Sequence, residues 1–252
     1  MGAAPRLELD SRSPEAVDGR QIRAVTFQDV RLEYLATVLP DPAGTHALVV
    51  GGGRGLLPRG LARLGMGVTA ADPSPAATAM AREAAEREGL PVDHDTAPAE
   101  RLPYPDDTFD LVYVADTFEI TDDLDQVVRE AARVLRRGGL LVYDTVNRTP
   151  VSRLIYLGAF QKLPMTRIMP PGRYAADRLR RPEEVAAALT RHGLVPGDVC
   201  AFKPKDGRSL VRATLARRRG EITDEQIPPM VRFVLDPGGR PVVTYFGHAR
   251  KS

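Results

Sequence analysis

Short apolar runs alternate with amphipathic stretches along most of the chain. The apolar runs predict buried parallel strands, which we expect at 46–50, 67–71, 91–95, 109–115 and 139–144. Between and around them apolar residues recur at helical spacing, and we expect helices at 26–38, 56–64, 75–88, 124–136 and 183–192. The regular alternation predicts an α/β fold with a doubly wound parallel sheet.

The alternation breaks twice in the last third of the chain. Residues 147–181 combine a short apolar stretch with several prolines, which predicts a small helical insertion of the kind that covers a substrate. After a strand at 194–202 and a basic helix at 209–219, two apolar runs at 231–235 and 242–246 surround the turn Asp236-Pro-Gly-Gly239. We expect these runs to form an antiparallel hairpin at the sheet edge.

The pattern predicts one principal domain of about seven strands. Residues 1–25 are polar and rich in turn formers, and we expect them to form a mobile N-terminal arm. The domain then covers 26–252, with the lid insertion at about 148–181 and an extra segment at about 206–236.

Composition narrows the functional classes. The 35 Lys and Arg against 33 Asp and Glu leave a formal charge of +2, which gives no support to a nucleic-acid partner. The single cysteine, Cys200, excludes an intramolecular disulfide and favours a reducing compartment. The N-terminus has no apolar leader and no stretch is apolar enough to span a bilayer, so we expect a cytoplasmic protein.

A glycine-rich turn follows the first predicted strand. Gly51, Gly53 and Gly55 would let the backbone approach a ligand, and Asp72 ends the next strand, where a carboxylate can accept hydrogen bonds from ribose hydroxyls. This arrangement favours a nucleoside ligand over a plain strand-to-helix turn. It does not distinguish a dinucleotide from a single nucleoside.

Two later segments identify the ligand class by resemblance. Leu102-Pro-Tyr-Pro-Asp-Asp-Thr-Phe-Asp110-Leu-Val-Tyr-Val and Val134-Leu-Arg-Arg-Gly-Gly-Leu-Leu-Val142 resemble signatures of the class I S-adenosylmethionine-dependent methyltransferases. The chain is more narrowly similar to the ubiquinone-biosynthesis O-methyltransferase-like family in three segments: Asp29-Val-Arg-Leu, Asp144-Thr-Val-Asn-Arg148 and Val243-Thr-Tyr-Phe-Gly-His-Ala-Arg-Lys251. The resemblance implies a Rossmann-like fold, S-adenosylmethionine as cofactor, and methylation of a small molecule, first of all at a hydroxyl on an aromatic or quinone-like biosynthetic intermediate.

The resemblance also implies a set of cofactor contacts. Arg31 would bind the methionine carboxylate, Asp72 the ribose and the pair Ala99-Glu100 the adenine. The full expected set is Arg31, Gly51, Gly53, Gly55, Asp72, Pro73, Ala99, Glu100 and Ala115.

Candidate catalytic and substrate-binding groups follow the strand ends and the lid. Asp116 and Glu119 come after the fourth strand and are candidate bases, although helix capping is an alternative for both. His248 near the end of the last strand is a third candidate, and His94 near the end of the third strand is another possibility. For the substrate we expect contacts from Asn147, Arg148, Leu157, Phe160, Arg173 and Tyr174. No ligand pattern for a metal occurs.

Three positions depart from the family pattern. Val49 stands where the family has an acidic residue, Pro98 where it commonly has Asp, and Ile120 where it has His. An aspartate placed at 49 would either tighten cofactor binding or destabilise the fold. The departures keep two alternatives open: a methyltransferase fold that catalyses a non-methylating cyclisation, elimination or rearrangement, and a non-catalytic biosynthetic partner.

Two basic runs leave the question of partners open. Residues 178–181 and 217–219 would suit a weak contact with a membrane surface or an acidic carrier, while solvated helix faces are the simpler alternative. The sequence does not determine the acceptor, its reacting atom or the oligomeric state.

Overall fold

The structure is a computed structural model that describes residues 5–252. Its helices and strands, in chain order, are α1 (Gly19–Val38), β1 (His46–Val50), α2 (Leu56–Arg63), β2 (Gly67–Asp72), α3 (Pro75–Arg87), β3 (Val92–Thr96), β4 (Phe109–Val114), α4 (Leu124–Val134), β5 (Leu135–Val146), α5 (Pro150–Ser152), η1 (Arg153–Ala159), α6 (Pro182–Arg191), β6 (Leu194–Pro196), β7 (Cys200–Pro204), α7 (Gly207–Arg218), η2 (Asp224–Gln226), β8 (Phe233–Asp236) and β9 (Thr244–Lys251). No helix among residues 5–252 is long and apolar enough to cross a bilayer.

One mixed sheet organises the described chain. Its strand order is β3-β2-β1-β4-β5-β9-β7-β8, and β6 pairs with β9 beside this path. Strands β1 to β5 are parallel, and β6 to β9 pair only in antiparallel fashion. The predicted doubly wound sheet with antiparallel strands on one side is confirmed. Because the strand order reverses between β1 and β4, a crevice is expected at their carboxyl ends.

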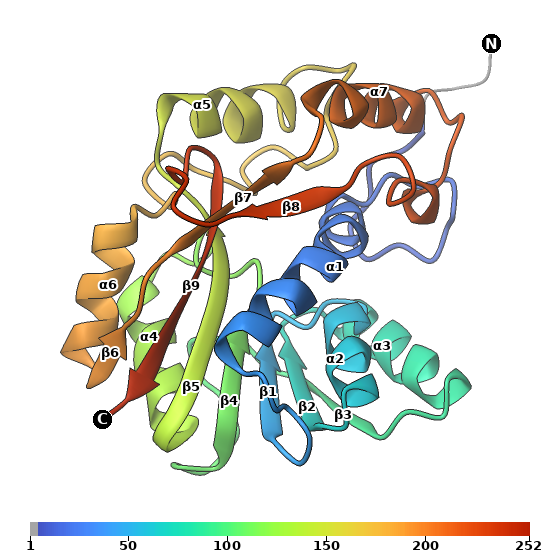
Figure 1. Ribbon diagram of the computed structural model, residues 1–252. Helices are drawn as coiled ribbons and strands as arrows, with labels where there is room; N and C mark the ends of the chain where they lie inside the picture. Colours follow the sequence, from blue (N-terminus) through green and yellow to red (C-terminus); the bar gives the residue numbers. More distant parts are fainter. Residues whose placement is uncertain (1–4) are drawn as a thin grey trace.

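Side chains of β1 alternate between two hydrophobic layers. Ala47 and Val49 pack in a cluster with residues of α1 and α2, whereas Leu48 and Val50 pack with residues of α4 and α6 on the other face. This period of two is the property that makes a short, wholly apolar run a strand buried on both faces. Figure 1 shows α1, α2 and α3 on one side of the parallel strands and α4 and α6 toward the other.

The C-terminal strands differ from the expected hairpin. The described chain has nine strands rather than about seven, partly because the run at 194–202 is divided into β6 and β7. The expected pairing of 231–235 with 242–246 is wrong, since β8 pairs with β7 and β9 lies between β5 and β7. β9 pairs with β5 along seven residues and so satisfies the backbone hydrogen-bonding groups of that buried strand. A turn between neighbouring segments gives no information about so distant a pairing.

Helix α1 begins earlier than expected. The Asp18 side chain accepts hydrogen bonds from the backbone N–H groups of Arg20 and Gln21, so the helix begins at Gly19 rather than near residue 26. Residues 5–18 of the expected arm include a bridge between Leu7 and Val17, and Val17 is fully buried. Residues 1–4 of that arm lie outside the described part.

The lid and the extra segment cover the first half of α1. Strands β7 and β8 leave the parallel strands and cross above α1, with α5 and α7 beyond them (Figure 1). The Phe27 ring of α1 lies 5.0 Å from the Phe202 ring of β7 and 4.7 Å from the Phe233 ring of β8, both nearly edge-on. The insertions therefore complete the core around the helix that carries the site.

The packing of Val49 leads to a prediction. Its side chain is fully buried between α1, α2 and the sheet, away from any polar cavity. We expect Val49→Asp to lower the free energy of unfolding by about 3–5 kcal/mol, because the carboxylate would have no partner there. Urea unfolding followed by circular dichroism measures this, with the exposed Val195→Asp as matched control. A stable Val49→Asp protein that binds cofactor more tightly would instead place this side chain at the ligand.

Candidate active site

A cavity of about 240 Å³ lies at the carboxyl ends of β1, β2 and β4. It is lined by the glycine turn and the start of α2, the loops after β2, β3 and β4, the buried face of α1, the end of the lid, and Asp10 of the N-terminal segment. The lining includes Arg20, Arg23, Arg31, Gly51, Gly53, Asp72, Pro73, Ala97, Ala99, Glu100, Ala115, Asp116, Ile120, Met169, Arg173 and Tyr174. The cavity thus occupies the crevice that the sheet topology predicts.

The three predicted glycines serve two purposes. A Cβ on Gly51, whose φ is 79°, would lie 2.3 Å from the carbonyl oxygen of Ala115. Gly53 has a φ of 53° and open space beside it, where only Arg20 comes within 4 Å. Gly55 does not line the cavity, because it begins α2 and lies against the Ala81 methyl group of α3. The first two glycines therefore shape the cavity and the third permits helix packing.

Asp72 presents a buried carboxylate at the end of β2. One of its oxygens accepts a hydrogen bond from the Ser74 backbone N–H at 2.9 Å. The other accepts from the Gly53 N–H at 2.8 Å and from the Arg20 guanidinium at 2.5 Å. Arg20 also pairs with Asp10 at 2.7 Å. Arg20 therefore links Asp10 of the N-terminal segment to the Asp72 carboxylate, which is expected to bind the ribose.

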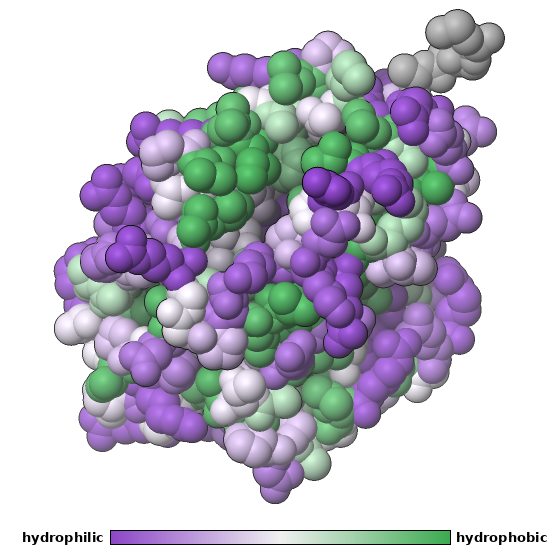
Figure 2. Space-filling model, turned by 45° about the horizontal axis from the view of Figure 1, so that its top comes forward, coloured by the Kyte–Doolittle hydropathy of each residue, from purple (hydrophilic) through white to green (hydrophobic). Residues whose placement is uncertain are grey.

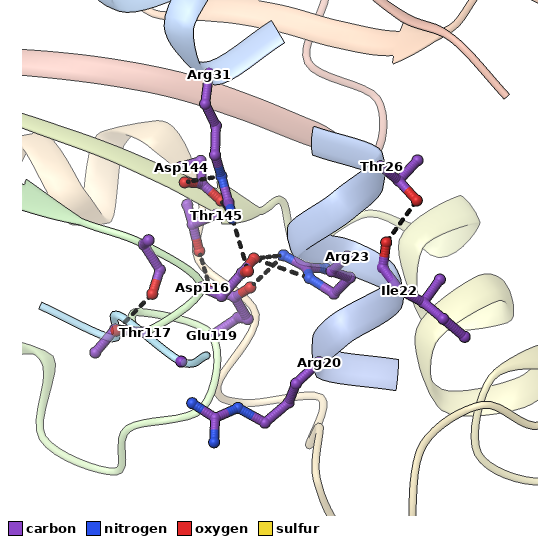
Figure 3. Close-up of polar contacts among 12 residues, drawn as sticks. Arg20, Ile22, Arg23, Thr26, Arg31, Asp116, Thr117, Glu119, Asp144 and Thr145 are labelled. Carbon is purple, nitrogen blue, oxygen red and sulfur yellow. Dashed lines mark hydrogen bonds and ion pairs between the residues drawn. The ribbon is translucent and has the colours of Figure 1, made fainter. Parts of the chain in front are cut away.

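Two arginines of α1 and three carboxylates form a buried arginine–carboxylate cluster (Figure 3). It comprises Arg23, Arg31, Asp116, Glu119 and Asp144. The Arg23 guanidinium donates to Glu119 at 2.8 Å and to Asp116 from its Nε at 2.8 Å. The Arg31 guanidinium contacts Asp116 at 2.6 Å and Asp144 at 2.8 Å. Asp116 thus lies between the two guanidinium groups.

The cluster holds one more carboxylate than guanidinium, and its pKa values reflect that excess. Burial raises the pKa of Glu119 to about 7, reinforced by Asp116 and Asp144, and Arg23 opposes this only in part. Burial also raises the pKa of Asp144 to about 6 against the attraction of Arg31. For Asp116 the burial effect is outweighed by Arg23 and Arg31, which hold its pKa below the ordinary range. Glu119 and Asp144 therefore titrate near neutrality, and Asp116 stays ionised.

Asp116 is the carboxylate of the cluster that faces the cavity. Its backbone has a φ of 48°, in the left-handed region that non-glycine residues seldom adopt. Its side chain is 26% exposed, whereas those of Glu119 and Asp144 are fully buried. Strained backbone at a cavity, held by two ion pairs, is typical of a functional position.

The structure brings most of the expected cofactor residues together. The predicted residues that line the cavity are Arg31, Gly51, Gly53, Asp72, Pro73, Ala99, Glu100, Ala115, Asp116, Arg173 and Tyr174. The predicted residues outside its lining are Gly55, Glu119, His248, Asn147, Arg148, Leu157 and Phe160. Glu119 is linked to the site indirectly, because it accepts a hydrogen bond from Arg23, which does line the cavity.

Both candidate histidines lie apart from the cavity. His248 pairs with Val142 in the middle of β5, because β9 runs antiparallel and its end is remote from the carboxyl ends of the parallel strands. Its Nδ1 lies 3.0 Å from the Tyr34 hydroxyl. His94 packs under Gly55, and burial lowers its pKa to about 4. Neither histidine is among the residues that line the cavity.

Four expected substrate contacts have other surroundings. Asn147 donates to the Pro241 carbonyl oxygen at 2.5 Å, and Arg148 donates to the Leu179 carbonyl oxygen at 2.7 Å, so both fasten the ends of the lid. Leu157 is half-buried against the core. Phe160 lines a second, apolar cavity behind Arg23.

Sequence reasoning missed Arg20, Arg23 and Tyr156. The Tyr156 hydroxyl of η1 accepts a hydrogen bond from Arg23 at 2.6 Å. A signal was present, since Arg20, Arg23 and Arg31 share one helical face with the apolar residues of α1. A charged residue on a core face requires a buried partner.

The departures from the family pattern have different consequences. Val49 lies in the core and Pro98 is exposed, and neither lines the cavity. Ile120 does line it. Only one of the three substitutions therefore alters the cavity wall.

The cavity residues fit S-adenosylmethionine. Asp72 supplies an acceptor for ribose hydroxyls, Gly51 and Gly53 leave the backbone accessible, and Ala97 and Ala99 give a small apolar wall for a flat base. At the other end, Arg31 would face the carboxylate group of the methionine part. Because Arg20 already bonds Asp72, a ribose hydroxyl must compete with that guanidinium.

Comparisons with known proteins agree with this geometry. A family model described as a methyltransferase domain matches residues 48–143. The ubiquinone biosynthesis O-methyltransferase of Xanthomonas axonopodis pv. citri is 35% identical over 197 residues, which cover 77% of this chain and 81% of that protein.

Two solved structures share the fold. The first is a SAM dependent methyltransferase from Aquifex aeolicus, with a TM-score of 0.58 and 16% identity over 94% of this chain and 95% of that one. The second is the [4+2]-cyclase SpnF, with a TM-score of 0.59 and 22% identity over 88% of this chain and 80% of that one.

The ribose position can be tested at Asp72. We expect Asp72→Asn to weaken S-adenosylmethionine binding by about 1.5–3 kcal/mol, the size of a charge-assisted hydrogen bond. Isothermal titration calorimetry measures the affinity. Asp93→Asn, an exposed carboxylate on neighbouring β3, is the matched control. Equal affinity of the Asp72 variant and the parent would remove the ribose from this position.

The cluster predicts a pH dependence of stability. The pKa of Glu119 is about 7 in the folded state against 4.5 ordinarily, so the folded protein retains a proton that the unfolded chain has released. This contribution to stability is complete below about pH 4.5 and is lost as the pH rises through about 7.

Glu119→Gln should therefore flatten the fall in the free energy of unfolding between about pH 5 and pH 7, by at most about 1.4 kcal/mol per pH unit. Urea unfolding at several pH values measures the slope. Glu130→Gln is the control, because a hydrogen bond from Arg133 lowers the pKa of Glu130. An unchanged slope in the Glu119 variant would show that this carboxyl group is ionised throughout.

Proposed function

The chain belongs to the S-adenosylmethionine-dependent methyltransferases, among the relatives of the ubiquinone biosynthesis O-methyltransferases, and on that premise we propose that it methylates a hydroxyl oxygen of an aromatic or quinone-like small molecule. The observation that carries the proposal is Asp116, held between Arg23 and Arg31 at the cavity wall. A carboxylate can accept the hydrogen bond of a hydroxyl, and a guanidinium beside it can stabilise the negative charge that develops on the hydroxyl oxygen.

The acceptor would lie at the lid end of the cavity. The nucleoside part of the cofactor takes the end at Asp72 and Gly53, which leaves the wall formed by Met169, Arg173 and Tyr174. The Tyr174 ring packs edge-on against Tyr156 at 4.9 Å, so this part of the wall is aromatic. A flat ring fits such a surface.

The residues of the cluster would have different roles in methyl transfer. S-adenosylmethionine, when bound, supplies an electrophilic methyl group. Asp116 would accept the hydrogen bond of the acceptor hydroxyl and orient its oxygen. Arg23 would stabilise negative charge on that oxygen, and the hydroxyl proton would pass along the hydrogen bond to Asp116 and from there to water.

Glu119 and Asp144 would act through the arginines. Each is fully buried and contacts a guanidinium, Glu119 on Arg23 and Asp144 on Arg31. Thr145 donates to the second oxygen of Glu119 at 2.9 Å, which fixes that carboxyl group. We therefore propose Glu119 as a positioning residue rather than the base that contacts the acceptor.

The proposal extends to compartment and partners. Cys200 is a free thiol, in keeping with a reducing compartment, and we propose the cytoplasm as the place of reaction. No cluster of metal-ligating side chains occurs in the part of the chain that the structure describes. A small molecule is the proposed substrate, with no role for nucleic acid.

The role of Asp116 is tested with labelled methyl donor and a panel of catechols, phenols, amines and thiols. We expect S-adenosylhomocysteine to form with hydroxylated rings, and we expect Asp116→Asn to lower kcat by about 10²–10⁴ with nearly unchanged cofactor affinity. Asp122→Asn, an exposed carboxylate in the same loop, should retain activity.

Each result has a contrary outcome. Turnover with amines or thiols alone would refute the hydroxyl acceptor. Full activity of Asp116→Asn would remove Asp116 from the reaction. Product formation without S-adenosylhomocysteine would favour a non-methylating reaction on this fold.

A further inference from the structure

Five arginines line the cofactor cavity, and one of them has no counter-charge. The four that pair with carboxylates are Arg20, Arg23, Arg31 and Arg54. The fifth is Arg173, at the end of the lid, which joins no acidic residue within residues 5–252. An unpaired guanidinium in a cavity wall is suited to an anion that the ligand brings.

The Arg173 guanidinium also has an unused buried donor. Its Nε is buried and has no hydrogen-bond partner in the described part of the chain. Among the carboxylates that line the cavity in residues 5–252, only Glu100 joins no arginine, and it accepts a hydrogen bond from the Thr121 hydroxyl at 2.6 Å. A buried donor without an acceptor costs free energy, which a bound acceptor would recover.

The backbone beside Arg173 is fastened to the loop that carries Asp116. The Arg178 guanidinium donates to the Gly172 carbonyl oxygen at 2.8 Å and to the Ile120 carbonyl oxygen at 3.0 Å. Gly172 precedes Arg173, and Ile120 belongs to the loop after β4. One bridging side chain therefore holds Arg173 in a fixed relation to Asp116, which preorganises both for a single ligand.

The neighbouring Tyr174 offers a second donor. The buried Gln161 side chain donates to the Tyr174 carbonyl oxygen at 3.1 Å and accepts from its backbone N–H at 3.0 Å, while the Tyr174 hydroxyl has no partner within residues 5–252. Burial raises the pKa of Tyr174 to about 12 against the opposing charges of Arg23 and Arg173, so the hydroxyl keeps its proton at neutral pH. It can donate to the anion that Arg173 binds.

The inner and outer surfaces of the lid differ in character. Outward, the lid exposes Leu154, Leu163 and Met165 at 72%, 55% and 71%. Figure 2, in which the top of the molecule comes forward, shows hydrophobic residues gathered on this side. Inward, Arg173 and Tyr174 form part of the cavity wall. A few polar groups placed in a pocket wall are the usual means of orienting a small ligand.

We infer that the acceptor carries a carboxylate on its hydroxylated ring, and that Arg173 binds this carboxylate with Tyr174 as a second donor. The inference rests on the proposed function, because the hydroxyl of the same ring would lie at Asp116. A guanidinium presents parallel N–H donors that match the two oxygens of a carboxylate. One unpaired cation balances a carboxylate, whereas a phosphate would bring up to two negative charges.

Steady-state kinetics with two matched acceptors tests the inference. Protocatechuate carries the carboxylate, and its methyl ester has the same hydroxyl groups without the charge. We expect kcat/KM for the acid to exceed that for the ester by about 10- to 100-fold, the factor given by one charge-assisted contact. Arg173→Gln should bring this ratio to about one, mainly by raising the KM of the acid. Tyr174→Phe should lower the ratio by a smaller factor.

Two further variants serve as comparisons. Arg173→Lys keeps the charge but loses the parallel donors, so it should keep part of the preference for the acid. Arg153→Gln makes the same change in charge at an exposed position of the lid outside the cavity lining, and it should leave the ratio unchanged. A defect of folding would lower the activity toward acid and ester equally, so the ratio reports the contact itself.

Equilibrium binding separates this inference from the proposed function. Benzoate, benzamide and phenyl phosphate are titrated into the protein saturated with S-adenosylhomocysteine, where no methyl group can be transferred. We expect benzoate to bind more tightly than the other two compounds, and Arg173→Gln to remove its advantage. If no hydroxylated ring is methylated while benzoate binding still depends on Arg173, the proposed function fails and the carboxylate subsite stands.

Three results would overturn the inference. The first is equal kcat/KM for acid and ester in the parent, or a ratio that Arg173→Gln does not change. The second is tighter binding of phenyl phosphate than of benzoate, which would make this a phosphate subsite. The third is a loss of S-adenosylmethionine affinity in Arg173→Gln at an unchanged ratio of acid to ester, which would assign the guanidinium to the cofactor carboxylate.

Discussion

The burial of two guanidinium groups against three carboxylates is the interaction on which the site depends. Arg23 and Arg31 belong to one helix, whereas Asp116 and Glu119 follow β4 and Asp144 lies near the end of β5. Removing either guanidinium group would leave uncompensated carboxylates in a dry interior, which costs far more than the pair contributes. The cluster therefore fixes the position of α1 over the strand ends and shapes one wall of the cavity.

Several neighbouring segments cover this cluster and exclude water from it. The Asp18 cap lets α1 begin early enough to carry Arg20 and Arg23. The lid contributes the Tyr156 hydroxyl to Arg23, and β7 and β8 close over Phe27. Each of these segments excludes water from the ion pairs, which strengthens them and raises the pKa of Glu119.

Features set by local pattern were predictable, and features set by distant contacts were not. The parallel strands follow from wholly apolar runs, and Asp72 follows from a glycine turn and its spacing to the next strand. The hairpin prediction failed because the turn at Asp236 is local, whereas β9 pairs with β5 about a hundred residues away. The position of His248 depends on the same pairing, because the antiparallel direction of β9 places it beside Val142 in the middle of β5. Arg23 was not among the predicted site residues, because its three partners, Asp116, Glu119 and Tyr156, come from distant parts of the chain.

The central claim is that the cluster keeps one carboxyl group protonated close to neutral pH. Carbon-13 NMR of glutamate side-chain carboxyl groups, recorded as a pH titration of the full chain, measures this directly. The account predicts one resonance that titrates with a midpoint near 7 and is missing in Glu119→Gln. It would be contradicted if every glutamate carboxyl group were already ionised at about pH 5.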